Sequence, residues 1–184
     1  NTNRSFLRSV LQLTQNKLFV RLLTGWFLSG VANGIPSVLF FLYLEKVLGV
    51  NEIQRAILIL IYFSTAVAAM PAWLSLSKVF NKHRVWCYAM ILAIGAFSLV
   101  PFLPEGAFYL ISIICILTGV CLGADLSIPP SIQADVLDYD KLKTRSQRAG
   151  LLFSLWGMAT KLALACSVGL AFPLLDWLGF EPDM

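Results

Sequence analysis

Five long apolar runs, separated by short polar segments, dominate the chain. Each run has about 20 or more mainly apolar residues, the length that an α-helix needs to cross the hydrocarbon core of a bilayer. The runs show no alternation of polar and apolar positions, and they are about twice as long as a strand of a membrane barrel. The pattern predicts five spanning helices, at about residues 22–44, 56–77, 85–104, 107–134 and 150–175.

The composition strengthens this prediction. Of the 184 residues, 58% are hydrophobic and 13% are charged, and the mean hydropathy is +0.78. Soluble domains carry about 25% charged residues. A soluble fold of this size has too little polar sequence to cover so much apolar surface, so the excess faces lipid. The expected fold class is an all-α membrane protein.

The basic residues orient the spans. The side that holds the N-terminus has eleven of the 14 basic residues, whereas the opposite side has Lys46 and Arg55. By the positive-inside rule, the N-terminus and both basic connections are cytoplasmic. The net charge of +4 does not indicate nucleic-acid binding, because the basic residues lie between apolar runs and form no basic face interleaved with aromatic residues. The eleven are Arg4, Arg8, Lys17, Arg21, Lys78, Lys82, Arg84, Lys141, Lys143, Arg145 and Arg148.

Residues 1–18 precede the first span and mix apolar with basic positions. They form either a cytoplasmic amphipathic helix on the inner leaflet or a disordered linker. Residues 19–184 form one helical bundle. Because the number of spans is odd and the chain starts on Asn1, we expect an internal fragment of a longer protein.

Two charged residues interrupt the apolar runs, Asp125 in the fourth and Lys161 in the fifth. An ionisable group near the middle of a bilayer costs at least ~2.5–3.5 kcal/mol on insertion scales and commonly marks a functional site. Counted from the cytoplasmic ends of their spans, the two lie about 15 and 18 Å deep at the helical rise. An ion pair or a shared polar cavity is therefore compatible with their depths, with Asn33, Gln133 and Trp156 as further candidates for the cavity.

Each candidate also has a structural interpretation. Asp125 stands near the Pro129-Pro130 pair and can simply stabilise the irregular backbone there. The four cysteines lie in apolar runs without a Cys-x-x-Cys pair, and there is one histidine, so neither a metal site nor a disulfide framework is expected. A membrane enzyme is disfavoured because the sequence shows no metal-binding pattern and has a single acidic residue within the apolar runs.

The connection between the fourth and fifth spans is dense in charge. Its acids and bases can form an ion-pair network at the cytoplasmic face, which breaks when the bundle rocks, or they form a solvated charged turn. The expected gate residues are Asp135, Asp138, Tyr139, Asp140, Lys141, Lys143, Arg145 and Arg148.

This connection resembles one in the glycoside–pentoside–hexuronide:cation symporters, the melibiose permease family of the major facilitator superfamily. Their tenth and eleventh helices are joined by an Ala-Asp-x-x-Asp-Tyr-x-x-x-Lys-Thr-Gly type motif, followed by Arg-x-Gly and a lysine in the next helix. Arg145 and Ala149 depart from the pattern, which leaves the substrate subgroup open. The matching residues are Asp135, Asp138, Tyr139, Lys143, Thr144, Arg148, Gly150 and Lys161.

The resemblance implies that the five spans are helices seven to eleven of a twelve-helix transporter, with helices one to six and the twelfth absent from this sequence. It also implies uptake of a sugar or sugar-like solute through alternating access, coupled to Na+ or H+ held mostly by the missing half, with no other cofactor. The expected partners are membrane lipid, the solute and the missing half, and the expected location is a bacterial inner membrane. Lys161 matches the family lysine that reaches toward the cation and sugar site. The alternative is a lysolipid transporter, or a regulatory relative that transports nothing.

Overall fold

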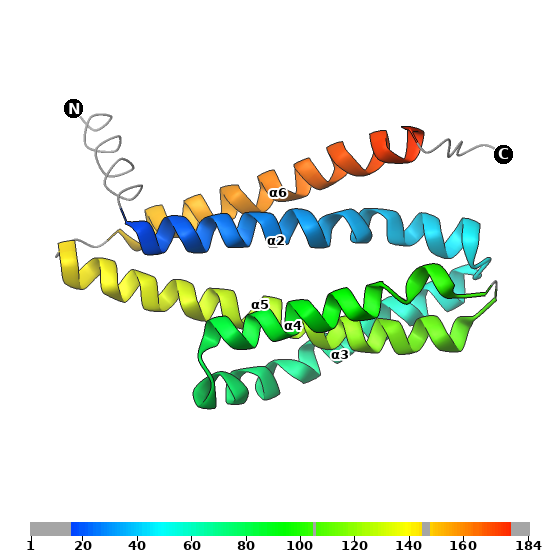
Figure 1. The fold of residues 1–184 in the computed structure, drawn as a ribbon, viewed down its shortest axis with the longest axis horizontal. Helices are drawn as coiled ribbons and strands as arrows, with labels where there is room; N and C mark the ends of the chain where they lie inside the picture. Colours follow the sequence, from blue (N-terminus) through cyan, green and yellow to red (C-terminus); the bar gives the residue numbers. More distant parts are fainter. Residues whose placement is uncertain (1–15, 105, 145–147, 178–184) are drawn as a thin grey trace. The chain divides into compact units, whose positions relative to one another are not determined.

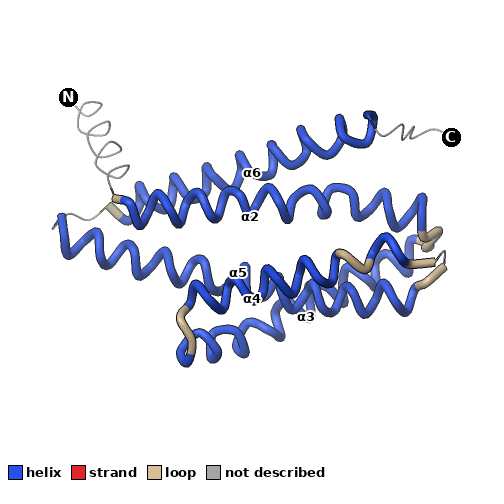
Figure 2. The backbone as a smooth tube through the Cα atoms, in the orientation of Figure 1, coloured by secondary structure: helices blue, strands red, loops and turns tan. Residues whose placement is uncertain are grey.

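The computed structural model describes residues 16–104, 106–144 and 148–177, and these ranges are helical without any strand (Figure 1, Figure 2). Five helices in this part of the chain are long and apolar enough to cross a membrane. The predicted all-α fold is therefore confirmed, while residues 1–15 of the predicted N-terminal segment lie outside the described ranges. The helices are α2 (Lys17–Leu42), α3 (Glu52–Val79), α4 (Lys82–Phe97), α5 (Phe108–Thr144) and α6 (Ala149–Trp177).

Local capping explains where the first two helices begin. The side-chain oxygen of Asn16 accepts the backbone N–H groups of Leu18 and Phe19, at 3.2 and 3.3 Å, and so satisfies donors that the first turn of α2 leaves open. A π-helical turn, Tyr43–Val47, extends α2, and the chain then turns at Gly49 with φ +62°. Asn51 and Gln54 form a reciprocal capping box at the start of α3.

The helix α5 runs for 37 residues, to Thr144, ten residues past the predicted end of its span. Hydropathy marks only the apolar part of a helix, and the sequence from Ser131 to Thr144 contains neither proline nor glycine to stop it. The charged motif from Asp135 to Lys143 therefore lies on the last turns of a helix, although the sequence pattern predicts that it belongs to the connection between two spans.

The chain divides into two compact units. The first lies within residues 1–41 and 133–184 and contains most of α2, the end of α5 and all of α6. The second comprises residues 42–132, with α3, α4 and the greater part of α5. The boundary on α5 follows directly after the Pro129-Pro130 pair, whose missing N–H groups remove two hydrogen bonds from the helix.

In the first unit, α2 and α6 lie side by side (Figure 1). Their close approach depends on glycine: a Cβ atom on Gly30 would stand 2.9 Å from the Cβ of Ala163, and one on Gly34 would stand 2.6 Å from the Cβ of Ser167. The Ser167 hydroxyl also lies 3.2 Å from the backbone oxygen of Val31. Small residues at such contacts are typical of helix pairs in membranes.

In the second unit, α3 and α5 approach each other in the same way. Added Cβ atoms on Gly119 and Gly123 would each lie 2.5 Å from a backbone oxygen of α3, that of Tyr62 and that of Ala66. The indole N–H of Trp73 donates a 2.8 Å hydrogen bond to the backbone oxygen of Val120. Gly119 and Gly123 are therefore explained by the close contact of their backbone with α3.

Candidate functional site

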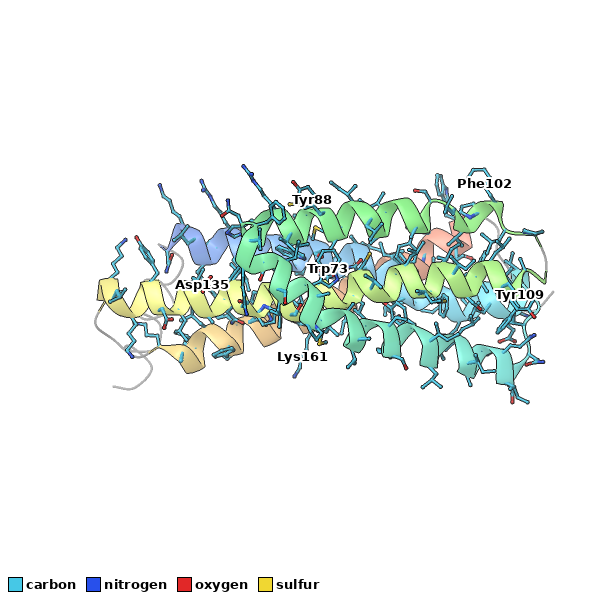
Figure 3. All side chains as sticks on the ribbon, turned by 90° about the horizontal axis from the view of Figure 1, so that it is seen from below. Trp73, Tyr88, Phe102, Tyr109, Asp135 and Lys161 are labelled. Atoms are coloured by element: carbon cyan, nitrogen blue, oxygen red, sulfur yellow. The ribbon has the colours of Figure 1, made fainter. Side chains whose placement is uncertain are left out.

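Lys161 lies near the middle of α6, twelve residues after Ala149, or about 18 Å along the helix axis. Its side chain is exposed on the surface of this chain (Figure 3). It forms no hydrogen bond or ion pair with any residue that the structure describes. A lysine at this depth therefore needs a partner from water, solute or further helices.

The face of α6 around Lys161 is lined by small residues. Gly150, Ser154 and Gly157 precede the lysine at helical spacing, so they share its face. A Cβ atom on Gly150 or Gly157 would meet nothing within 4 Å. These two glycines are thus not required by packing among the described residues, and the space beside Lys161 is open.

Trp156 faces a different direction from Lys161. Its ring stacks on that of Trp26, with centroids 4.6 Å apart and planes inclined by 19°. The indole N–H of Trp26 donates to the hydroxyl of Thr160 at 2.8 Å, and that hydroxyl lies 3.0 Å from the backbone oxygen of Trp156. Trp156 therefore faces α2, and five residues of helical rotation put Lys161 about 140° away from it.

Asn33 and Gln133 lie in the first unit but differ in exposure. Asn33 is exposed on α2, and its amide nitrogen is 3.4 Å from the hydroxyl of Ser29. Gln133 is 2% exposed on α5, and its buried Nε2 atom has no hydrogen-bond partner among the described residues. The shared cavity predicted for Lys161, Asp125, Asn33, Gln133 and Trp156 stays a prediction.

Asp125 has a partner within the second unit. Its carboxylate accepts a 2.6 Å hydrogen bond from the indole N–H of Trp86, a buried residue of α4. A short charge-assisted hydrogen bond of this kind accommodates a carboxylate inside a bundle. Lys161 belongs to the first unit, so the ion pair between these two residues stays a prediction.

The predicted gate residues differ in exposure. Asp135, Asp138, Tyr139, Lys141 and Lys143 are exposed on the end of α5, where Figure 3 labels Asp135. Arg148 precedes α6 and is half-buried, and Arg145 lies outside the described residues.

Asp140 stands apart from these residues, because its side chain is only 3% exposed. One carboxylate oxygen accepts a 3.1 Å hydrogen bond from the amide nitrogen of Asn16. The other oxygen, Oδ2, is buried and has no partner among the described residues. The sequence placed Asp140 in the gate network, and its burial shows that it does not share the exposed surface of the other acids.

Sequence reasoning missed three contacts: Asn16 with Asp140, Trp86 with Asp125, and the pair of stacked tryptophans. An asparagine directly before an apolar run is a capping signal, so the role of Asn16 at the start of α2 was accessible. Its second role was not, because no local pattern shows that the end of α5 lies beside it. Within the described residues, no group of three metal-binding side chains occurs, and the four cysteines are free thiols.

Comparisons with known proteins cover the whole chain. Residues 1–184 match the family described as MFS/sugar transport protein. An uncharacterized symporter from Synechocystis sp. is 23% identical over 97% of this chain and 33% of its own length. Sodium-dependent lysophosphatidylcholine symporter 1 from Xenopus tropicalis is 25% identical over 96% of this chain and 34% of that protein.

The Homo sapiens protein of the same name is 24% identical over 96% of this chain and 33% of its length. The chain thus spans about a third of the length of the curated relatives that it matches. No solved structure matches it significantly.

Proposed function

We propose that this chain, which belongs to the MFS/sugar transport protein family, is part of a symporter that couples solute uptake to a Na+ or H+ gradient. Its five helices correspond to helices seven to eleven of twelve, in the C-terminal half of a transporter of the melibiose permease type. The solute is a sugar or a sugar-like molecule. The N-terminal end of α2 is cytoplasmic, and the membrane is a bacterial inner membrane.

The observation that carries this proposal is the exposed position of Lys161 in the middle of a spanning helix. A charge there is stable only with a counter-charge or a hydrated cavity. The open space beside Gly157 allows another helix or a solute to approach the lysine. Carboxylates from the other half of the transporter, which also bind the coupling ion, supply that counter-charge.

Coupling then follows from competition for these carboxylates. When the coupling ion binds to them, Lys161 is released from its ion pairs and its three N–H donors become available to solute hydroxyl groups. The ion and the solute therefore favour the same conformation of the protein, and each strengthens the binding of the other. The exposed charges at the end of α5 form contacts that close the cytoplasmic face in one conformation only.

The test is a Lys161→Ala substitution in the full-length transporter, reconstituted in proteoliposomes. We expect loss of gradient-driven melibiose accumulation by about 100-fold, the effect of removing a coupling energy near 3 kcal/mol. The matched control is Lys78→Ala, which removes the same charge from an exposed position in the last turn of α3 and leaves accumulation unchanged. Normal accumulation in the Lys161→Ala variant would refute the assigned role.

A second candidate solute is a lysophospholipid, because relatives similar to this chain are named as sodium-dependent lysophosphatidylcholine symporters. In that case Lys161 pairs with the phosphate of the lipid. Parallel uptake assays with radiolabelled melibiose and radiolabelled lysophosphatidylcholine distinguish the two. Saturable, gradient-dependent uptake of the lipid and no uptake of melibiose would replace the sugar with the lipid.

A further inference from the structure

Asp140 and Asn16 connect two helix ends of the first unit that are 124 residues apart in sequence. The amide nitrogen of Asn16 donates to Asp140, while its amide oxygen accepts the N–H groups of Leu18 and Phe19. Both the nitrogen and the oxygen of the Asn16 side-chain amide therefore form hydrogen bonds. Through it, the positive end of the α2 dipole is directed at the carboxylate, which is a favourable arrangement.

The contact is partly buried, with a buried apolar residue one helical turn from each partner. Phe19, one turn after Asn16, is 2% exposed, and Val136, one turn before Asp140, is also buried. Because Oδ2 of Asp140 has no partner among the described residues, the bond from Asn16 is the one described hydrogen bond to the carboxylate. Separating the two residues would leave a buried carboxylate without a described donor, which is far more costly than breaking an exposed ion pair.

From this contact, we propose that Asn16 and Asp140 are positioning residues that form a fixed joint. The start of α2 and the end of α5 move as one body throughout the transport cycle, and the joint holds the exposed acids Asp135 and Asp138 where the gate closes. Asp140 itself takes no part in opening and closing. This inference rests on the proposed transport function, since it assigns a role within the alternating-access cycle.

A covalent link tests whether the joint opens. In a cysteine-free background of the full-length transporter, Asn16→Cys and Asp140→Cys are combined and joined by a short bifunctional methanethiosulfonate. Uptake of melibiose and of lysophosphatidylcholine is then measured under a Na+ or H+ gradient. We expect efficient cross-linking. Uptake by the linked variant should stay within about twofold of uptake by the same variant before the reagent is added, because a rigid body is unaffected by an internal link. A loss of about tenfold or more that a reductant reverses would overturn the joint.

Two controls make the cross-linking result specific. A monofunctional methanethiosulfonate on the same variant separates the link from the modification. The pair Asn16→Cys with Tyr139→Cys, whose native side chain is exposed on the same helix end, should cross-link poorly. Equal yields for positions 139 and 140 would contradict the packing on which the joint depends.

An exchange of polarity tests the positioning role. Asn16→Asp places two carboxylates together, and we expect it to lower the Vmax per folded transporter by about tenfold or more, with KM unchanged. Adding Asp140→Asn restores the hydrogen bond in the opposite direction and keeps a good capping residue at position 16, so Vmax recovers. Failure of the exchange to restore Vmax would overturn the proposal.

The joint and the proposed function fail in distinguishable ways. If the unmodified transporter accumulates neither melibiose nor lysophosphatidylcholine, the proposed function is wrong. The joint is then judged by the melting temperature alone, which should fall with Asn16→Asp and recover with the exchange. A melting temperature that stays low in the exchanged variant would reject the joint as well.

Discussion

At Gly34, the absence of a side chain decides how closely α2 and α6 approach. A Cβ atom there would overlap the hydroxyl oxygen of Ser167, which is itself fully buried. The Cβ of Ser167 would stand 2.6 Å away and is fixed to the backbone of α6, so the two helices would have to move apart. The glycine is therefore required by packing, and the proline at position 36 lies just beyond the contact.

We expect Gly34→Ala to destabilise the full-length protein by about 1–3 kcal/mol, the usual effect of forcing atoms into a filled contact. The matched control is Gly169→Ala on α6, where an added Cβ atom meets nothing within 4 Å. That change should be neutral or stabilising by up to about 1 kcal/mol, since alanine favours helices over glycine. Melting temperatures of the purified variants in detergent measure both effects, and equal shifts would contradict the contact.

In the second unit, two tryptophans donate hydrogen bonds to α5, one to a charged acceptor and one to a neutral acceptor. Trp86 donates to the Asp125 carboxylate, and Trp73 donates to the backbone oxygen of Val120. Both indole groups reach α5 from a neighbouring helix, so they fix the positions of α4 and α3 against it.

Phenylalanine at either position keeps most of the ring and removes the donor. Trp86→Phe should cost about 1.5–3 kcal/mol and Trp73→Phe about 0.5–1.5 kcal/mol, because hydrogen bonds to charged groups contribute more than neutral ones. Unfolding measurements on the two variants test this order. Combining Trp86→Phe with Asp125→Asn should recover part of the loss, and a purely additive result would show that the bond contributes nothing.

At the scale of whole helices, the sequence identified each spanning element but not its full length. Hydropathy reports the part of a helix that lipid covers, so it located the apolar portion of α5 and missed the turns from Asp135 to Thr144. Hydropathy also does not distinguish the buried Asp140 from the exposed acids Asp135 and Asp138. That difference arises from contact with Asn16, which a single sequence does not reveal.

The two charges within the apolar runs were also found from the sequence, but their contacts were not. Sequence reasoning found Asp125 and Lys161 because charges are rare in apolar runs. Their similar depth predicts an ion pair or a shared cavity, which stays a prediction, and within its own unit each residue has different surroundings. The aspartate accepts a hydrogen bond from Trp86, and the lysine is exposed with no described partner.

For the whole molecule, the orientation of the spans stays a prediction, which rests on basic residues at the helix ends. Lys17 begins α2, Lys78 lies in the last turn of α3, and Lys82 begins α4, while Lys141 and Lys143 lie in the last turn of α5. Each is at the end that chain order assigns to the cytoplasmic side. The same end holds Asn16 and Asp140, so the proposed joint and the proposed gate act at one face of the membrane.

The central claim is that the full-length protein is a cation-coupled symporter. The direct measurement is accumulation of melibiose or lysophosphatidylcholine by proteoliposomes that carry an inward Na+ or H+ gradient, compared with the same vesicles after ionophores collapse the gradient. We predict accumulation above the external concentration that disappears with the gradient. Uptake that equilibrates to the same level with and without the gradient would contradict the claim.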